Sequence, residues 1–534
     1  MGLFSKKKND PLKSTTPPRS HTEESNEIKK LQTKLQDNIK IVKGTLGGSS
    51  DTIIREIRIG KGGVLKAGII YTDGLSDAPS IQNFILESLM LDIKNTEVES
   101  KLTLNPQLMN TLKDFAMTVG EVKDVTNFDE LLNALLSGDV IFLIDGYSNG
   151  LIIGNKHWVD RGVTESSTQT VIRGPREAFS ENLRVNTALI RRKIKDPKLW
   201  MESRVIGIRT KTNIEIMYIK GIASDEIVGE VRIRLDRINI DGILESGNIE
   251  ELIQDANNSS FPTVYNTERP DVVAAALLEG RIAILIDGTP FVLIVPALFV
   301  QFFQSAEDYY QRADLTSLIR ILRFFSFTIA LLAPAVFIAA TTFHHEMIPT
   351  ALLISLAAQR EGVPFPAFVE ALIMEITFEI LREAGIRMPK AVGSAMSIVG
   401  AFVIGSAAVE AGIVSAAMVI VVSMTAIASF VTPTYDMGMT IRILRFVFMG
   451  LAASFGLFGI TVGLIALVLH LCSLRSFGVP YMSPIAPFNA DGQQDTFVRF
   501  PLWKMRTRPH LISQENIDRQ QNSASAKPEP EKGQ

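Results

Sequence analysis

The chain has 534 residues, 46% of them hydrophobic, and its 54 basic side chains nearly balance 57 acidic ones, giving a formal net charge of -3. This balance excludes a broad basic surface, and neither zinc-finger spacing nor a helix-turn-helix is present, so no nucleic acid partner is expected. The single cysteine, Cys472, excludes an intramolecular disulfide and a thiolate metal site. The charges are unevenly spread, because residues 324–474 contain only 8 carboxylates and 6 basic side chains. We therefore expect the C-terminal third to lie in a different solvent from the rest.

The first segment, residues 1–43, is predicted to be a disordered basic arm. It contains 10 basic and 5 acidic side chains together with many Ser, Thr, Asn and Pro residues. Such a composition offers too little apolar surface to offset the entropy lost when the chain becomes ordered. Lys6, Lys7 and Lys8 could approach an anionic membrane surface, although a soluble tail is the favoured interpretation.

Residues 44–155 and 156–310 are predicted to form two related α/β subdomains. Short apolar runs bounded by Gly and Asp are typical of buried strands, and here they alternate with segments of helical periodicity. The repeated motifs lie 142 residues apart and are Ala-Leu-Leu-Ser-Gly at 134–138 with Leu-Ile-Asp-Gly at 143–146, and Ala-Leu-Leu-Glu-Gly at 276–280 with Leu-Ile-Asp-Gly at 285–288. This repetition predicts a duplicated fold.

The motifs of this region do not indicate an enzyme. Asp145 and Asp287 each stand between an apolar run and a Gly, an arrangement more typical of a turn than of a catalytic aspartate. The Gly-Lys-Gly-Gly stretch at 60–63 lacks P-loop spacing, and no HExxH motif is present. We therefore predict no enzymatic activity, no cofactor and no metal site.

Residues 318–474 are predicted to form an α-helical membrane domain. About 20 apolar residues cross the hydrocarbon core as a helix, and continuous apolar runs exclude the alternating pattern of a membrane barrel. The charge-free runs long enough to be spans are 324–345, 391–409, 411–435 and 446–474. Basic residues before the first run and after the last place both ends in the cytoplasm, including a tail at 475–534.

Three carboxylates lie on one side of a predicted amphipathic helix between these runs. At 100° per residue, Glu375, Glu379 and Glu383 fall within an arc of about 80°. The helix either lies along the interface or lines water, and the membrane domain has four or six spans depending on whether residues 347–384 cross. The carboxylates are candidates for an ion pathway, as carboxylate rings are in cation channels, or they form ion pairs on a solvated face.

Small residues at helical spacing are candidates for close helix packing. Ser397, Ala401 and Gly405 lie in one predicted span, and Gly459 and Gly463 lie in another. Small side chains let helices approach closely where lipid supplies no hydrophobic drive. Packing between subunits and packing within the chain are equally compatible with this pattern.

Several longer stretches identify a family by resemblance. They are Thr-Glu-Arg-Pro-Asp at 267–271, Leu-Leu-Glu-Gly-Arg at 277–281, Asp-Gly-Thr-Pro at 287–290, Glu-Asp-Tyr-Tyr at 307–310, Arg-Glu-Gly-Val-Pro-Phe-Pro at 360–366, Glu-Ile-Leu-Arg-Glu-Ala-Gly at 379–385 and Ser-Phe-Gly-Val-Pro-Tyr at 476–481. With these motifs in order, the chain resembles the A subunits of the GerA-type spore germinant receptors from about residue 40 to residue 510.

The resemblance implies a cytoplasmic region of two α/β subdomains and a polytopic helical domain in the spore inner membrane. It also implies two partners, a polytopic permease-like B subunit and a lipoprotein C subunit, with germinant recognition usually placed on the B subunit. The A subunit of such a receptor is expected to form a homo-oligomer and to conduct ions when nutrient binds. Three alternatives remain, namely a sporulation paralogue associated with dipicolinate release, a membrane transporter or scaffold, and a small-solute site between the two α/β subdomains.

Overall fold

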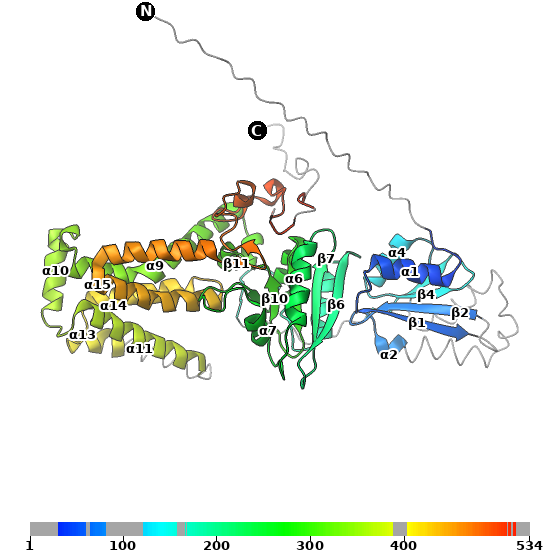
Figure 1. Cartoon of the computed structure of the whole chain (residues 1–534), viewed down its shortest axis with the longest axis horizontal. Helices are drawn as coiled ribbons and strands as arrows, with labels where there is room; N and C mark the ends of the chain where they lie inside the picture. The colour runs from blue at the N-terminus through cyan, green and yellow to red at the C-terminus, as the bar shows by residue number, and fades with distance from the viewer. Residues whose placement is uncertain are drawn as a thin grey trace, which may run out of the picture.

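A computed structural model of the chain joins an N-terminal α/β region to a C-terminal helical part (Figure 1). It describes residues 30–59, 65–81, 121–156, 166, 168–387, 403–509, 511–513 and 516–519.

The α/β region contains two antiparallel five-stranded sheets with the same strand order (Figure 1). The first sheet, in the order β1-β2-β4-β5-β3, consists of β1 (Thr52–Ile59), β2 (Leu65–Thr72), β3 (Val122–Val125), β4 (Val140–Ile144) and β5 (Gly150–Ile153). The second, in the order β6-β7-β9-β10-β8, consists of β6 (Leu199–Ile206), β7 (Thr212–Ile219), β8 (Tyr265–Thr267), β9 (Ile282–Ile286) and β10 (Val292–Val295). The Leu-Ile pair of the repeated Leu-Ile-Asp-Gly motif forms the end of β4 and of β9, and the Asp-Gly pair follows each strand. All residues of both strands are buried. The duplication seen in the sequence thus has a counterpart in topology.

Helices cover the sheets. Those that the structure describes in the α/β region are α1 (Leu35–Thr45), α2 (Ala78–Ser80), α4 (Phe128–Leu135), α5 (Leu183–Lys193), α6 (Asp225–Asp236), α7 (Ser246–Ile253) and α8 (Pro270–Leu278). The repeated aspartates hold the first turns of equivalent helices. Asp145 Oδ1 accepts from the backbone N–H of Leu35 at 2.9 Å, and Asp287 Oδ1 accepts from that of Leu183 at 3.2 Å. An oxygen acceptor satisfies an otherwise unpaired N–H at a helix start. Both aspartates therefore have a structural role.

The prediction of a disordered arm to residue 43 was wrong for its last part. Helix α1 begins at Leu35 and buries Leu35, Ile39 and Val42 beneath the first sheet. These side chains recur at helical spacing and make an apolar stripe. The surrounding lysines and polar residues masked this stripe in the average composition. Residues 1–29 lie outside the described residues.

A buried ion pair joins the two α/β halves. Arg191 Nε of α5 lies 2.8 Å from Asp51 Oδ2, and each side chain is only 1% exposed. Nearby, Trp200 Nε1 donates to the Thr45 carbonyl at 3.3 Å. The Trp200 ring covers Gly47 so closely that no side chain fits there. The two sheets are therefore fixed to each other by buried polar and aromatic contacts.

The helical part follows two short 3-10 helices, η6 (Phe299–Phe303) and η7 (Ala306–Tyr309). Among the described residues, its elements are α9 (Ala313–Thr342), η8 (His345–Met347), α10 (Thr350–Arg360), α11 (Ala367–Arg387), η9 (Val403–Ala407), α13 (Ala408–Glu410), α14 (Ala416–Phe430) and α15 (Tyr435–Ser473). Within the described residues, α9 and α15 are long and apolar enough to cross a membrane by length and composition. Within the predicted span at 411–435, the long helix is α14, which has 15 residues. Its length is about 22 Å at 1.5 Å per residue. The predicted span at 391–409 lies largely outside the described residues.

Helix α15 is two helices that fold back on each other at Gly456. This residue has φ 61° and ψ -140°, which breaks the helix. A Cβ atom placed on Gly463 would lie 2.9 Å from the Phe448 ring, although the two residues are 15 positions apart. The predicted span at 446–474 is therefore divided between segments 435–455 and 457–473. Hydropathy does not reveal this turn, because the residues on both sides of it are apolar.

Contacts at both ends fix the direction of these helices. Thr434, just before α15, donates to the Phe302 carbonyl at 3.2 Å, and His470 near its end lies 2.9 Å from Ser259 Oγ. At the far end, Gly456 packs against Phe343 at the end of α9. Segments 435–455 and 457–473 thus run away from the α/β region and back to it (Figure 1).

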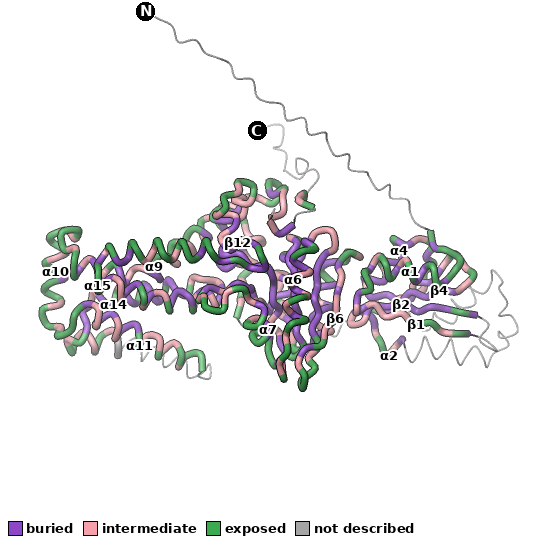
Figure 2. Tube along the Cα trace, in the orientation of Figure 1, coloured by how far each residue is buried: buried purple, intermediate pink, exposed green. Residues whose placement is uncertain are grey.

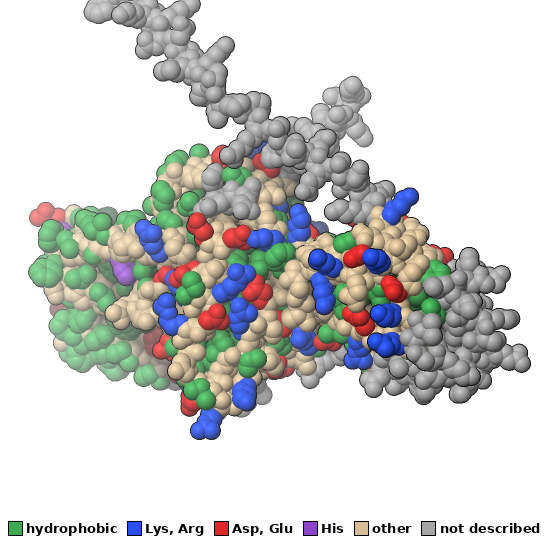
Figure 3. Space-filling view, turned by 45° about the vertical axis from the view of Figure 1, so that its right-hand side comes forward, with side chains coloured by type: hydrophobic (Ala, Val, Ile, Leu, Met, Phe, Trp, Pro, Cys, Tyr) green, Lys and Arg blue, Asp and Glu red, His purple; other side chains and the backbone are tan. Residues whose placement is uncertain are grey.

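The outer surface of the helical part is apolar. In Figure 3 hydrophobic side chains gather over this part, while charged side chains lie over the α/β region. Figure 2 shows buried residues running through the strands and many exposed residues along the helices. Exposed apolar side chains on long helices are typical of a surface in contact with lipid or another protein.

The predicted tail at 475–534 is in large part a packed element of the fold. Its short strands β11 (Arg475–Ser476) and β12 (Val479–Pro480) pair with each other, and the 3-10 helices η10 (Asp491–Gln494) and η11 (Leu502–Lys504) follow. Phe477, Val479 and Ile512 join the core of the second sheet. Position after the last predicted span did not reveal this packing, in which apolar residues of the tail complete the α/β core.

Candidate functional site

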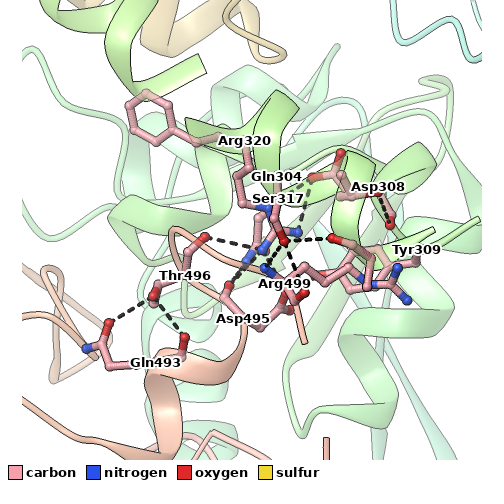
Figure 4. A network of polar contacts seen from close by, with 12 residues as sticks. Gln304, Asp308, Tyr309, Ser317, Arg320, Gln493, Asp495, Thr496 and Arg499 are labelled. Atoms are coloured by element: carbon pink, nitrogen blue, oxygen red, sulfur yellow. Dashed lines mark hydrogen bonds and ion pairs between the residues drawn. The ribbon is translucent and has the colours of Figure 1, made fainter. Parts of the chain in front are cut away.

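The first candidate site is a buried polar network where α9 leaves the α/β region (Figure 4). Arg320 is 0% exposed and lies between two carboxylates, with Nη2 3.1 Å from Asp308 Oδ2 and Nη1 2.7 Å from Asp495 Oδ1. Arg323, one helical turn later, also reaches Asp308 at 2.8 Å. A capping box between Ser305 and Asp308 holds the Asp308 side chain in position. The network ties α9, η7 and the C-terminal segment together.

The C-terminal segment contributes further bonds to this network. Tyr309 donates its hydroxyl to Asp495 Oδ2 at 2.6 Å, and Gln304 Nε2 donates to the Asp495 carbonyl at 2.7 Å. Burial raises the pKa of Tyr309 well above its usual range, so the hydroxyl remains a donor. Arg499 is buried and donates to the Gln311 carbonyl at 3.0 Å. These bonds hold residues 495–499 along the first turns of α9.

A second junction connects the second sheet to the start of α15. Asn266 Nδ2 donates to Asp436 Oδ2 at 2.7 Å and lies 3.4 Å from Glu250 Oε2. Burial, with a smaller effect of the Asp436 charge, raises the pKa of Glu250 to about 7. Two carboxylates therefore share one amide at the boundary between the α/β region and the helices.

The third site is an ionic core inside the helical part. Glu375 of α11 is 0% exposed, and its Oε2 lies 2.5 Å from Nη1 of Arg445 in α15. Arg445 also donates through Nε to the Ala330 carbonyl of α9 at 2.8 Å. Glu379 lies 3.0 Å from Arg442 Nη1 and 3.6 Å from Arg382 Nη1. Charges that would be costly in lipid are thus paired between three helices.

The predicted ion-pathway residues are therefore in different surroundings. Glu375 and Glu379 face arginines of α15, whereas Glu383 pairs with Arg387 at 2.6 Å on an exposed part of α11. Buried atoms without a hydrogen-bond partner remain in the ionic core, among them Glu375 Oε1 and Arg445 Nη2. The pairing gives two of the carboxylates a structural role, and their part in an ion pathway stays a prediction.

The candidate packing residues also differ in their surroundings. Gly459 lies against the Leu451 backbone and Gly463 against the Phe448 ring, so both face the other half of α15. A Cβ atom placed on Gly405 would have no atom outside its own helix within 4 Å. Ser397 and Ala401 lie outside the described residues.

Sequence reasoning missed the arginines that partner the carboxylates. Arg442 and Arg445 stand three residues apart at the edge of an apolar run, and this spacing places both on one helix face. That signal was available, but it does not reveal which of several carboxylates lies opposite. Among the residues that the structure describes, no group of three or more His, Cys, Asp or Glu side chains could hold a metal ion.

A duplicated α/β region joined to helices with an apolar surface and an ion-paired interior defines the class as a membrane-associated protein. The chain belongs to the GerA family, because its residues 40–511 match the family described as Bacillus/Clostridium GerA spore germination protein. The resemblance inferred from the sequence motifs is thereby confirmed.

Relatives match the chain along almost its whole length. Spore germination protein KA of Bacillus subtilis (strain 168) is 49% identical, over 99% of this chain and 96% of that protein. The membrane protein YfkQ of the same organism is 45% identical, over 92% of this chain and 94% of that protein. Spore germination protein GerLA of Bacillus cereus is 41% identical, over 90% of this chain and 96% of that protein.

A solved structure is also similar. It is the crystal structure of the N-terminal domain of the A subunit of the Bacillus megaterium spore germinant receptor GerK3. It is 40% identical in sequence, covers 52% of this chain and 99% of that chain, and has a TM-score of 0.42.

Proposed function

We propose that this chain is the A subunit of a nutrient germinant receptor of bacterial spores. The observation that carries the proposal is the match of residues 40–511 to the GerA family, with spore germination proteins more than 40% identical along nearly their full length. In this proposal the chain acts with a permease-like B subunit and a lipoprotein C subunit in the spore inner membrane. The α/β region lies on the cytoplasmic side, the spore core.

The helical part is proposed to cross the membrane several times. Helix α9 and segment 435–455 run away from the α/β region, and segment 457–473 returns to it. The pairing of Glu375 with Arg445 fixes α11 among these helices, which supports a crossing rather than a position along the surface. Paired charges inside a helix bundle are compatible with a membrane interior.

We further propose that a homo-oligomer of this subunit conducts monovalent cations when germinant binds the complex. In this proposal the arrangement described above is closed, because Arg442 and Arg445 neutralise Glu379 and Glu375. Opening then exchanges the arginine partners for permeating cations, which carboxylate side chains attract.

The test uses spores of a strain that lacks other nutrient receptors. Deletion of the gene should abolish the response to at least one nutrient of a panel, and the intact gene should restore it. A normal response of the deletion spores to every nutrient contradicts the receptor role.

Ion conduction is tested separately by potassium release after nutrient addition. Glu375→Gln, Glu379→Gln and Glu383→Gln should each slow release several-fold at normal protein level, while Glu226→Gln on the exposed face of α6 leaves it unchanged. Release at the wild-type rate from all three variants rejects the carboxylate pathway and leaves the receptor role intact.

A further inference from the structure

The outer face of the first turns of α9 is apolar. Arg320 and Arg323 face the buried network. At 100° per residue, Leu322 lies about 200° around the helix from Arg320, and Phe325 lies about 200° from Arg323, so both apolar side chains point to the opposite side. The exposed apolar side chains of this stretch are Leu315, Leu318, Ile321, Leu322 and Phe325. One side of the first turns of α9 thus contacts the α/β region, and the opposite side is apolar and exposed.

The C-terminal segment extends this surface sideways. Ser317 Oγ accepts from the Arg499 backbone N–H at 3.1 Å, and the Phe497 ring lies 4.6 Å from the Phe324 ring. This fixed segment and the following 3-10 helix expose four apolar side chains. Their exposed fractions are 42% for Phe497, 39% for Val498, 50% for Leu502 and 36% for Trp503. An anchored backbone therefore leaves four large apolar side chains partly exposed.

Exposed cations accompany these side chains. Lys504 Nζ lies 4.4 Å from the centre of the Phe500 ring, and Arg506 is exposed. We call the exposed apolar side chains of 315–325 and 497–503, together with Lys504 and Arg506, the collar. Aromatic side chains beside lysine and arginine are typical of the membrane interface, and cations near an anionic leaflet are favoured.

We infer that the collar lies in the anionic headgroup layer of the leaflet facing the α/β region, with Trp503 as its anchor. This inference rests on the proposed membrane crossing of α9. It commits to lipid rather than protein because the apolar face of the collar continues along α9 through the half-buried Ile329 and Leu332 to the exposed Val336 in the helical part. The positive charge of Lys504 and Arg506 also complements an anionic headgroup.

The test uses the full chain reconstituted into phosphatidylglycerol/phosphatidylcholine vesicles. The chain has 3 tryptophans, so a W158F/W200F variant leaves Trp503 as the only reporter. Its emission should be shifted to the blue and quenched several-fold more strongly by lipids brominated near the headgroup than by iodide in the water. The W158F/W503F variant retains Trp200, between the two α/β halves, and should show no quenching by brominated lipid.

The charge contribution is tested in the same reporter variant. Lys504→Glu with Arg506→Glu should reduce bromolipid quenching and shift the emission to the red, whereas Arg209→Glu with Lys211→Glu in the β6–β7 loop should leave both unchanged.

Flotation of the vesicles separates the possible failures. Protein that does not float with lipid contradicts the proposed membrane domain. Protein that floats while Trp503 is accessible to iodide and unaffected by brominated lipid overturns the collar. Protection of Trp503 from both quenchers assigns the surface to a protein neighbour and also overturns it.

Discussion

Glu375 and Arg445 are 70 residues apart in the chain and form an ion pair in which both side chains are at most 1% exposed. Burial of two charges is costly, and removal of one partner leaves the other uncompensated. We expect Glu375→Leu or Arg445→Met alone to destabilise the protein by about 3–5 kcal/mol. The double variant should recover most of this loss, as measured by thermal unfolding of the full chain in detergent.

The exposed pair Glu383–Arg387 is the matched control for this experiment. Exposed pairs at this spacing contribute about 0–1 kcal/mol, so Glu383→Gln should hardly change the unfolding temperature. A double variant less stable than both single variants would contradict the assignment of the loss to an unpaired buried charge.

The turn at Gly456 can be tested by cross-linking. In a Cys472→Ser background, cysteines at Phe448 and Gly463 should react with a short bifunctional thiol reagent to give an intramolecular product. In a continuous helix the two positions would be about 22 Å apart at 1.5 Å per residue, out of reach of such a reagent. Proteolysis between the sites followed by electrophoresis under denaturing conditions detects the product.

The control pair for this cross-link has cysteines at Phe448 and Gly438, which lie in the same helical half and about 15 Å apart. Equal yields from the two pairs would argue for a continuous α15.

Glu250 makes the stability of the protein depend on pH. Its pKa is raised from 4.5 to about 7 in the folded protein, so the folded state binds the proton more tightly than the unfolded state. Stability should therefore fall as pH rises from about 4.5 to about 7 and then level off. The size of the fall is on the order of 1–3 kcal/mol.

Glu250→Gln should flatten this part of the pH profile and increase the unfolding temperature at pH 8. Glu251→Gln, at the neighbouring exposed position in α7, is the control and should retain the wild-type slope. A slope unchanged by Glu250→Gln assigns the pH dependence to other groups.

Tyr481 in the C-terminal segment is fully buried, and its hydroxyl has no hydrogen-bond partner among the described residues. Its ring packs edge-on against Phe299 at 6.0 Å. Tyr481→Phe should be neutral or stabilising by about 1 kcal/mol, because it removes a buried unpaired group. Tyr481→Ala should destabilise by about 3–5 kcal/mol through the cavity it leaves.

Thermal unfolding of both variants distinguishes packing from polarity at this position. If Tyr481→Ala were as stable as the native chain, the packing of Tyr481 would not hold the segment after α15 in the fold.

Local patterns in the sequence determined much of this protein. The spacing of apolar residues and charges predicted helices in a membrane-like solvent, because hydropathy is a property of consecutive residues. The repeated Asp-Gly motifs predicted the duplication, because the same turn and helix start recur at Asp145 and Asp287.

Only the tertiary structure decided which distant groups meet. Whether Glu375 faces lipid, water or Arg445 depends on how two helices pack, which no local pattern encodes. The reversal at Gly456 is equally hidden, since apolar residues flank it and glycine is also tolerated within membrane helices. The burial of Tyr481 follows from a core built by sheets and helices that come before it in the chain.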